Sequence, residues 1–164
     1  RDARILAIYE GTNGIQAIDL VARKLPLSGG EAVRRLIAGL RATVQRVTKE
    51  GDERFGDTAS RLRDAVESLD RTTSHLLAAL RSNTPDTALA GATPYLRLFG
   101  LAQGGAALAE AALAAASGSS EADRGRVALA RFFAENCVPA CEGLEAAVLA
   151  GARLRDDVEF ALAS

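Results

Sequence analysis

One glutamate near the start of the chain stands in a context that suits acid–base chemistry. Glu10 follows the uncharged, apolar residues 5–9, and no charge lies between Arg4 and Glu10. A carboxylate that emerges from apolar surroundings is open to desolvation, which raises its pKa and suits it to accept a proton. The alternative is an ordinary solvated loop carboxylate, because a perturbed acid marks a functional site only statistically.

The residues directly behind Glu10 have the properties of a ligand-binding turn. Gly11 permits backbone angles and a close ligand approach that a side chain would block. Thr12 is a favourable N-cap for a helix that begins near Asn13. Because the N–H groups at a helix N-terminus are free, such a helix start can hold an anion such as a phosphate.

Residues 1–16 resemble the C-terminal signature of the acyl-CoA dehydrogenases, flavoenzymes that oxidise acyl-CoA thioesters. The family pattern is an Arg-Asp-Ala start, then Ile-Tyr-Glu-Gly-Thr, then a helix that carries Ile-Gln. The matching residues here are Arg1, Asp2, Ala3, Ile8, Tyr9, Glu10, Gly11, Thr12, Ile15 and Gln16. Many positions agree in a fixed order, so the signature is specific, although it covers only residues 1–25.

The resemblance implies a role for each residue of the turn. Glu10 would be the catalytic base, which removes the proton α to the thioester carbonyl while the β-hydride goes to FAD. The enolate charge must be stabilised as it forms, and in the family the backbone N–H of this glutamate helps to hold the thioester oxygen. Gly11 would line the substrate pocket, and Thr12, Asn13 and Gly14 would lie beside FAD, with Gly14 restricted to backbone contacts.

The resemblance also implies partners and a setting. The substrate would be an acyl-CoA, the electron acceptor an electron-transfer flavoprotein, and the enzyme a cytoplasmic homo-oligomer of fatty acid metabolism. The long helical region after the signature resembles that of the larger bacterial acyl-CoA dehydrogenases. It also resembles the extension of the membrane-associated very-long-chain enzymes, but the chain lacks a strongly basic amphipathic helix. A non-catalytic helical-bundle interaction module that keeps a remnant of the signature is the alternative function.

Composition excludes several classes of protein. The 164 residues hold 20 Lys and Arg against 21 Asp and Glu, so no global basic field is present for nucleic acid, and we expect no membrane span. The single His is far in sequence from Cys137 and Cys141, which predicts buried thiols and no metal site. Because the chain has no Met and opens inside the signature, we expect a C-terminal piece of a larger enzyme, inactive and free of FAD when isolated.

Hydrophobic periodicity predicts helices throughout. The first helix, residues 13–25, should bury Ile15, Ile18, Ala22 and Leu25, and Pro26 should end it. We therefore expect residues 1–27 to close the dehydrogenase domain and residues 28–164 to form a separate helical extension.

The extension reads as four longer helices. Ser28 and Glu31 have the spacing of a capping box for a helix that runs to residue 49. A second helix should span residues 58–80, and a third should span residues 87–117 with a kink or split at Pro94. The fourth should begin after a cap at Ser120, bend at Pro139 and stop at Gly151.

The apolar stripes of these helices predict one core. The predicted stripes are Val33, Leu36, Leu40, Val44 and Val47; Leu62, Val66, Leu69, Thr73, Leu76 and Leu80; and Val127, Ala130, Ala134, Cys137, Cys141, Leu144 and Val148. A short closing helix should cover residues 155–164. The sequence therefore predicts an all-α fold, an antiparallel four-helix bundle preceded by the last helix of the dehydrogenase domain, and the bundle should serve docking or oligomerisation.

Overall fold

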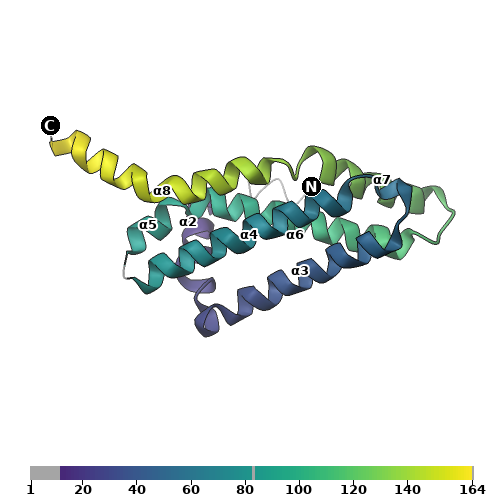
Figure 1. Cartoon of the computed structure of the whole chain (residues 1–164), viewed down its shortest axis with the longest axis horizontal. Coiled ribbons are helices and arrows are strands. Elements are labelled where there is room, and N and C mark those ends of the chain that lie inside the picture. Colours follow the sequence, from purple (N-terminus) through teal and green to yellow (C-terminus); the bar gives the residue numbers. More distant parts are fainter. Residues whose placement is uncertain (1–11, 83, 164) are drawn as a thin grey trace.

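The computed structural model describes residues 12–82 and 84–163, apart from the side chains of Thr12 and of residues 152–163. Within these ranges all regular structure is helical (Figure 1). The elements are α2 (Thr12–Asp19), the π-helical turn η1 (Leu20–Lys24), the 3₁₀ turn η2 (Leu27–Gly30), α3 (Glu31–Glu50), η3 (Glu53–Phe55), α4 (Thr58–Arg81), α5 (Pro85–Ala90), α6 (Ala92–Ala115), α7 (Glu121–Asn136) and α8 (Ala140–Ala163). The predicted all-α class is confirmed.

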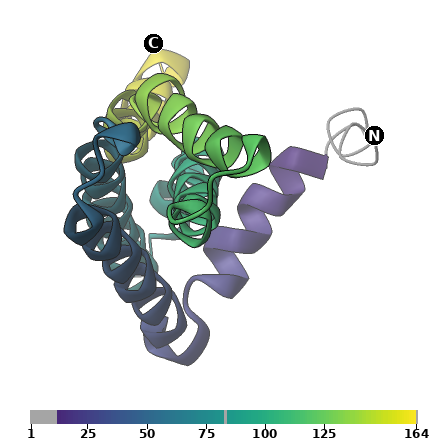
Figure 2. The same cartoon turned by 90° about the vertical axis from the view of Figure 1, so that its right-hand side faces the viewer.

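The long helices form a four-helix bundle in which α7 and α8 together make the fourth arm (Figure 1). Seen along the bundle, α6 lies in the middle, α3 and α4 on one side, and α2 on the opposite side (Figure 2). The chain reverses direction from α3 to α4, from α4 to α6 and from α6 to α7 (Figure 1). The predicted antiparallel bundle with a preceding helix is therefore confirmed.

The core stripes of α3 and α4 lie where the periodicity places them. In α4, Leu62, Val66 and Leu69 have no exposed surface, and Thr73 and Leu76 are also buried. In α3 the predicted Leu36 is only partly buried, and its neighbour Ile37 enters the core. Two adjacent apolar residues compete for one inward position there, and a pattern of spacings alone does not decide between them.

α6 differs from its neighbours because apolar residues lie on several of its sides and its only charged side chains are Arg97 and Glu110. By length and composition it is the one helix in the described chain that could cross a membrane. In the bundle, however, it contacts α3, α4, α7 and α8 at the centre, as the core helix of a folded domain does. Its buried positions are largely alanines, and Gly105 brings its backbone against the side chain of Leu62. Small residues thus allow close helix packing.

Two helix breaks differ from the predicted positions. The predicted split near Pro94 occurs at Gly91, and Pro94 lies in the first turn of α6, where a proline is tolerated. The predicted bend at Pro139 is a complete break, because α7 ends at Asn136 and α8 begins at Ala140.

The predicted stop at Gly151 is wrong, because α8 continues through it to Ala163, and the expected closing helix is the end of α8. A Cβ at Gly151 would lie 3.2 Å from the Cβ of Ala90, and one at Gly91 would lie 3.2 Å from the carbonyl oxygen of Val148. The glycine is therefore a contact point between α8 and α5 rather than a terminator.

One predicted cap is confirmed and one is wrong. The Ser120 Oγ accepts a hydrogen bond from the Asp123 N–H at 3.1 Å, and the Asp123 carboxylate accepts from the Ser120 N–H at 3.3 Å. No such box forms at Ser28 and Glu31, because Ser28, Gly29 and Gly30 all adopt left-handed backbone angles, with φ of 53°, 66° and 87°. Gly30 occupies the N-cap position of α3, so the Ser28 side chain makes no cap there.

Ala17, Val21 and Leu25, which precede the predicted domain boundary at residues 27 and 28, belong to the same buried cluster as the bundle helices. The boundary itself stays a prediction. The segment before it is anchored on the bundle through α2 and η1.

Candidate functional site

The structure describes only part of the predicted site. Glu10 and Gly11 lie outside the described residues. α2 begins at Thr12, and the exposed residues Asn13 and Gly14 follow in its first turn. No described atom lies within 4 Å of the position that a Cβ on Gly14 would take, leaving out the helix's own backbone. The start of α2 is therefore open to a ligand or to another part of a protein.

A change in helical geometry sets the orientation of α2. Its buried residues are Ala17, Val21 and Leu25, each four positions apart. In a regular α-helix such a row drifts sideways, since four residues exceed one turn of 3.6. The π-helical turn at Leu20–Lys24 widens the helix and keeps the row aligned against the bundle, with the Leu25 N–H donating to the Leu20 carbonyl at 2.8 Å.

The predicted face of this helix is wrong. Ile15 is 65% exposed and Ile18 is 50% exposed, and Ala22 is exposed as well, whereas only Leu25 of the predicted set is buried. The prediction assumed α-helical periodicity through residue 25, and the π turn invalidates that assumption. The α2–η1 segment therefore presents one apolar face to the bundle and another away from it.

Asp19 forms two ion pairs at the junction of α2 and η1. Its carboxylate pairs with Arg23 Nη1 at 2.9 Å and with Lys24 Nζ at 3.0 Å. The hydrogen bond from Lys24, supported by the charges of both cations, lowers the pKa of Asp19. This acid is held in its ionised form and does not suit a general base at neutral pH.

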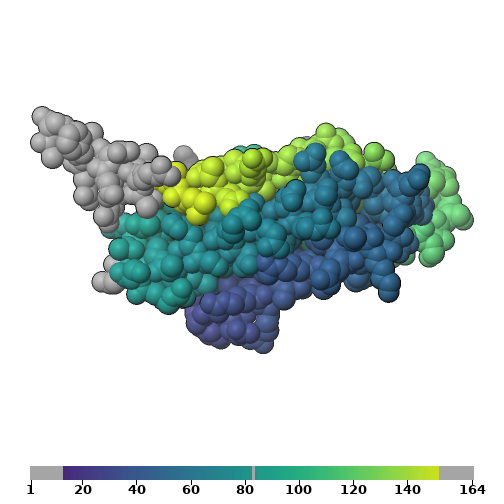
Figure 3. All heavy atoms as spheres, viewed as in Figure 1, coloured from purple at the N-terminus to yellow at the C-terminus, as the bar shows by residue number. Residues whose placement is uncertain are grey.

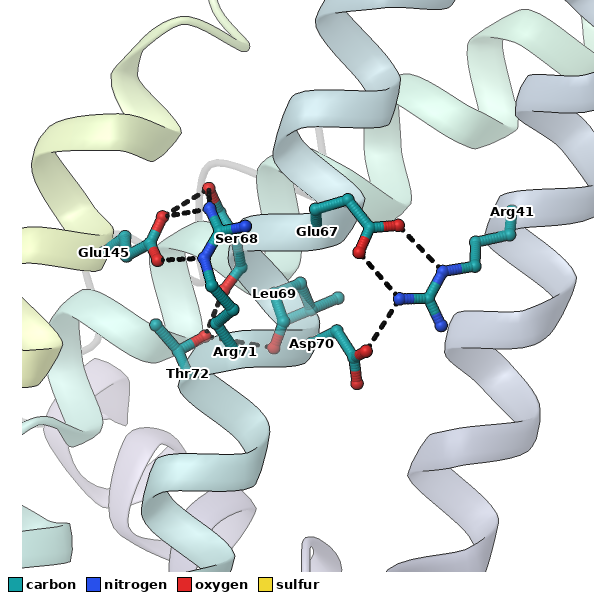
Figure 4. Close-up of polar contacts among 8 residues, drawn as sticks. All are labelled: Arg41, Glu67, Ser68, Leu69, Asp70, Arg71, Thr72 and Glu145. Atoms are coloured by element: carbon teal, nitrogen blue, oxygen red, sulfur yellow. Dashed lines mark hydrogen bonds and ion pairs between the residues drawn. The ribbon is translucent and has the colours of Figure 1, made fainter.

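A charged trough of about 420 Å³ runs between α4 and the α7–α8 break. α4 lies between α3 and α8 on one face of the molecule (Figure 3). Glu145 of α8 accepts hydrogen bonds from Ser68 Oγ at 2.6 Å and from Arg71 Nε at 2.6 Å (Figure 4). The bond from Arg71 holds the pKa of Glu145 below its usual range.

On the other flank of α4, Arg41 of α3 binds two acids (Figure 4). Its guanidinium donates to both oxygens of Glu67, at 2.9 and 2.8 Å, and to Asp70 at 2.7 Å. Hydrogen bonding to Arg41 lowers the pKa of Glu67. No local pattern in the sequence predicts these pairs, because the partners of Arg41 are 26 and 29 residues away along the chain.

The bundle contains no activated nucleophile in its described part. Cys141 is buried, and burial raises the pKa of its thiol to about 11, which keeps it protonated. Cys137 is only partly buried, so the predicted burial holds for Cys141 alone, and both thiols are free. The Nε2 atom of His75 is buried without a hydrogen-bond partner among the described residues. No group of three or more His, Cys, Asp or Glu side chains there could hold a metal ion.

Comparison with known proteins identifies the family of this helical domain. Residues 36–155 match the family described as acetyl-CoA dehydrogenase C-terminal like. The chain belongs to this family. The matched region of the acetyl-CoA dehydrogenase C-terminal-like domain begins within α3 and ends within α8, so it coincides with the bundle.

Curated relatives of this domain are much longer proteins. The chain is 39% identical over 146 residues to 3-methylmercaptopropionyl-CoA dehydrogenase from Ruegeria pomeroyi. The aligned region covers 86% of this chain and 24% of the relative. It is 30% identical over 152 residues to butyryl-CoA dehydrogenase from Syntrophomonas wolfei. The aligned region covers 87% of this chain and 24% of that relative. The chain thus spans about a quarter of the length of the curated relatives it matches.

Proposed function

We propose that this chain is the C-terminal part of an FAD-dependent acyl-CoA dehydrogenase that converts an acyl-CoA to its 2,3-enoyl-CoA. The observation that carries the proposal is the family match over residues 36–155, joined to the Ile8-Tyr9-Glu10-Gly11-Thr12 signature, whose last residue begins α2. Both curated relatives are named as dehydrogenases of acyl-CoA compounds.

Glu10 is proposed as the base that removes the α-proton of the thioester. The interhelical carboxylates Glu67, Glu110 and Glu145 do not compete for this role, because hydrogen bonds lower their pKa values. Such acids are poor proton acceptors near neutral pH. Gly11 would line the substrate pocket, next to the base.

FAD, when bound, supplies the acceptor for the hydride that leaves the β carbon. The exposed Asn13 and the open surroundings of Gly14 fit a cofactor that approaches the first turn of α2. Thr12 would be the third residue on this side. The described residues form no enclosed cavity that would hold the whole cofactor, so other parts of the enzyme must supply most of its contacts.

The helical bundle is proposed as a docking or oligomerisation domain of a cytoplasmic homo-oligomer. Its polar side chains join its own helices rather than lining a second catalytic site, as Arg41 and Glu145 show. Electrons would leave the flavin for an electron-transfer flavoprotein.

The test is Glu10→Gln in the full-length enzyme. Flavin content should stay at the wild-type level, and reduction of the flavin by acyl-CoA under anaerobic conditions should slow by a factor of about 10²–10⁴, the usual contribution of a general base. Glu142→Gln, at an exposed carboxylate of α8, is the matched control and should reduce flavin normally. Normal flavin reduction in Glu10→Gln would remove Glu10 from its role.

The isolated chain provides a second check. We expect it to bind no stoichiometric FAD, because the cofactor contacts lie mostly outside it. A yellow, flavin-saturated preparation of residues 1–164 would contradict this expectation, and absorbance at the flavin band measures it directly.

A further inference from the structure

The α2–η1 segment has two apolar faces, and the bundle uses only one of them. The inner row, Ala17, Val21 and Leu25, is at most 1% exposed and packs into the core. In the outer row, Ile15 and Ile18 are three residues apart within α2, which places them on one side of the helix, and Ala22 in the π turn is exposed as well. Two large aliphatic side chains therefore point away from the bundle.

The outer row is exposed in an otherwise well-packed segment. Ile15 is 65% exposed and Ile18 is 50% exposed, although isoleucine is among the residues most often fully buried in proteins. A helix at the edge of a domain normally has a polar outer face. In α2 the charged groups gather instead at the end of the helix, where Asp19 pairs with Arg23 and Lys24. The outer row carries no charge of its own.

The position of α2 indicates what covers this row. α2 lies on the outside of the bundle, and no other described helix lies beyond it (Figure 2). Ile15 follows Glu10 by five residues, so the outer row comes directly after the proposed active-site segment. The curated relatives are about four times the length of the matched region, which is 24% of each. A body attached to this end of α2 is covalently held beside the row at a high effective concentration.

We propose that the outer row, Ile15, Ile18 and Ala22, is a docking surface for the part of the same polypeptide that precedes residue 1. The inference rests on the proposed function, in which the chain is part of a longer dehydrogenase. α2 is then held on both sides, by the bundle core and by the preceding body. The bundle consequently fixes the helix that follows Glu10, and its contribution to the enzyme is to restrict the position of the base.

The test is hydrogen exchange on the full-length protein carrying Ile18→Lys. The matched control is Leu129→Lys on α7, which replaces an aliphatic residue of similar exposure, 53%, far from α2. In Ile18→Lys the amides of α2 should exchange about tenfold faster than in the wild type, because local opening no longer breaks an apolar interface. In Leu129→Lys, exchange in α2 and in α7 should stay at the wild-type rate.

Two results would overturn the proposal. The first is wild-type exchange in α2 of the Ile18→Lys protein. The second is dissociation of an oligomer, seen by light scattering, together with faster exchange in α2 of the resulting monomer, since a second copy would then have covered the row. If Ile18→Lys does not fold, Ile18→Ser gives the same comparison with a smaller change.

The readout separates this inference from the proposed function. Amide exchange in α2 needs no turnover, so it reports docking even in an inactive protein. Normal flavin reduction by Glu10→Gln would remove the catalytic role of Glu10 and leave the exchange result intact. Unchanged exchange in Ile18→Lys would remove the docking surface and leave the role of Glu10 intact.

Discussion

α4 and α6 have the same length, 24 residues, and pack against each other in the core, but they are held in different ways. α4 has one apolar stripe flanked by polar residues that pair with Arg41 on α3 and with Glu145 on α8 (Figure 4). α6 has few polar side chains and packs through alanines and Gly105. α4 is thus held on both flanks by hydrogen bonds and ion pairs. α6 combines two polar contacts, Tyr95 with Thr73 of α4 and Glu110 with Thr43 of α3, with close packing at its buried alanines and Gly105.

The largest effect should come from a charge in the stripe of α4. Leu69 has no exposed surface, and Leu69→Asp would bury an unpaired carboxylate. We expect a loss of more than about 4 kcal/mol, enough to unfold the bundle in a thermal melt followed by circular dichroism. Ser74→Asp, at an exposed position of the same helix, should change stability by less than about 0.5 kcal/mol. A melting temperature that Leu69→Asp leaves unchanged would show that the stripe is misassigned.

The polar contact between α4 and α6 should make the folding stability of the protein depend on pH in the alkaline range. Tyr95 of α6 lies 2.7 Å from Thr73 Oγ1 of α4, and burial raises the pKa of Tyr95 from about 10 to about 12. The unfolded chain therefore loses this proton first, so the stability that depends on it is complete below pH 10 and is lost as the pH rises toward 12. The loss should reach about 2–3 kcal/mol by pH 12.

Tyr95→Phe tests the origin of this loss. The variant should cost about 1–2 kcal/mol at neutral pH, since the buried Thr73 hydroxyl loses its partner. Its free energy of unfolding in urea should then fall less steeply than that of the wild type between pH 10 and 12. Parallel pH profiles for the two proteins would exclude Tyr95 as the source.

Two glycine-to-alanine substitutions in α6 should distinguish the effect of close helix packing on stability from the effect of helix propensity. A Cβ at Gly105 would lie 2.5 Å from Leu62 Cδ2 and 3.3 Å from Val138 Cγ2, whereas one at Gly100 would meet nothing within 4 Å. Gly100→Ala should stabilise the protein by about 0.5–1 kcal/mol. Gly105→Ala should destabilise it by about 1 kcal/mol net, because overpacking outweighs the gain in propensity. Equal shifts of the urea midpoint would mean that α6 and α4 are not in close contact at Gly105.

The smallest effect should come from the ion pairs on the flank of α4. Arg41→Ala removes the bonds to Glu67 and Asp70, but all three side chains are partly exposed. We expect a loss of about 0.5–1 kcal/mol, which should shrink in high salt as the charges are screened. Arg35→Ala is the matched control, because the one ion-pair partner of Arg35 among the described residues is Glu31 of its own helix, at 3.7 Å. A loss in Arg41→Ala of several kcal/mol that salt does not change would indicate a buried network instead.

The same contrast explains which parts of the fold the sequence could predict. The predicted stripe of α4 is buried from Leu62 to Leu76, and its last residue, Leu80, is partly buried. Ser120 and Asp123, three positions apart, form the predicted cap of α7. Such features depend only on near neighbours in the chain. The all-α class follows from the same local patterns.

The errors arise where distant contacts or unusual backbone angles decide the structure. Gly151 resembles a helix terminator, but it remains helical because α5 approaches it. Ser28 resembles a cap, but its left-handed backbone prevents that role. The face of α2 was misassigned because a π turn changes the spacing.

The candidate site was predicted only as a motif. The order of residues identified Glu10 and its neighbours, and the structure adds Asn13 and Gly14 as exposed residues at the start of α2. The roles of all five site residues stay predictions. The apolar outer row of α2 could not be foreseen, because the sequence pattern had placed Ile15 and Ile18 in the core.

The pairing of α8 with α4 has a consequence for the order of folding. Arg41 and Glu67 are 26 residues apart, whereas Ser68 and Glu145 are 77 residues apart. Closing the longer loop costs more chain entropy before any contact compensates for it. We therefore expect the α3–α4 hairpin to form early and α8 to add last, so that during synthesis the far side of α4 stays uncovered until α8 has been made.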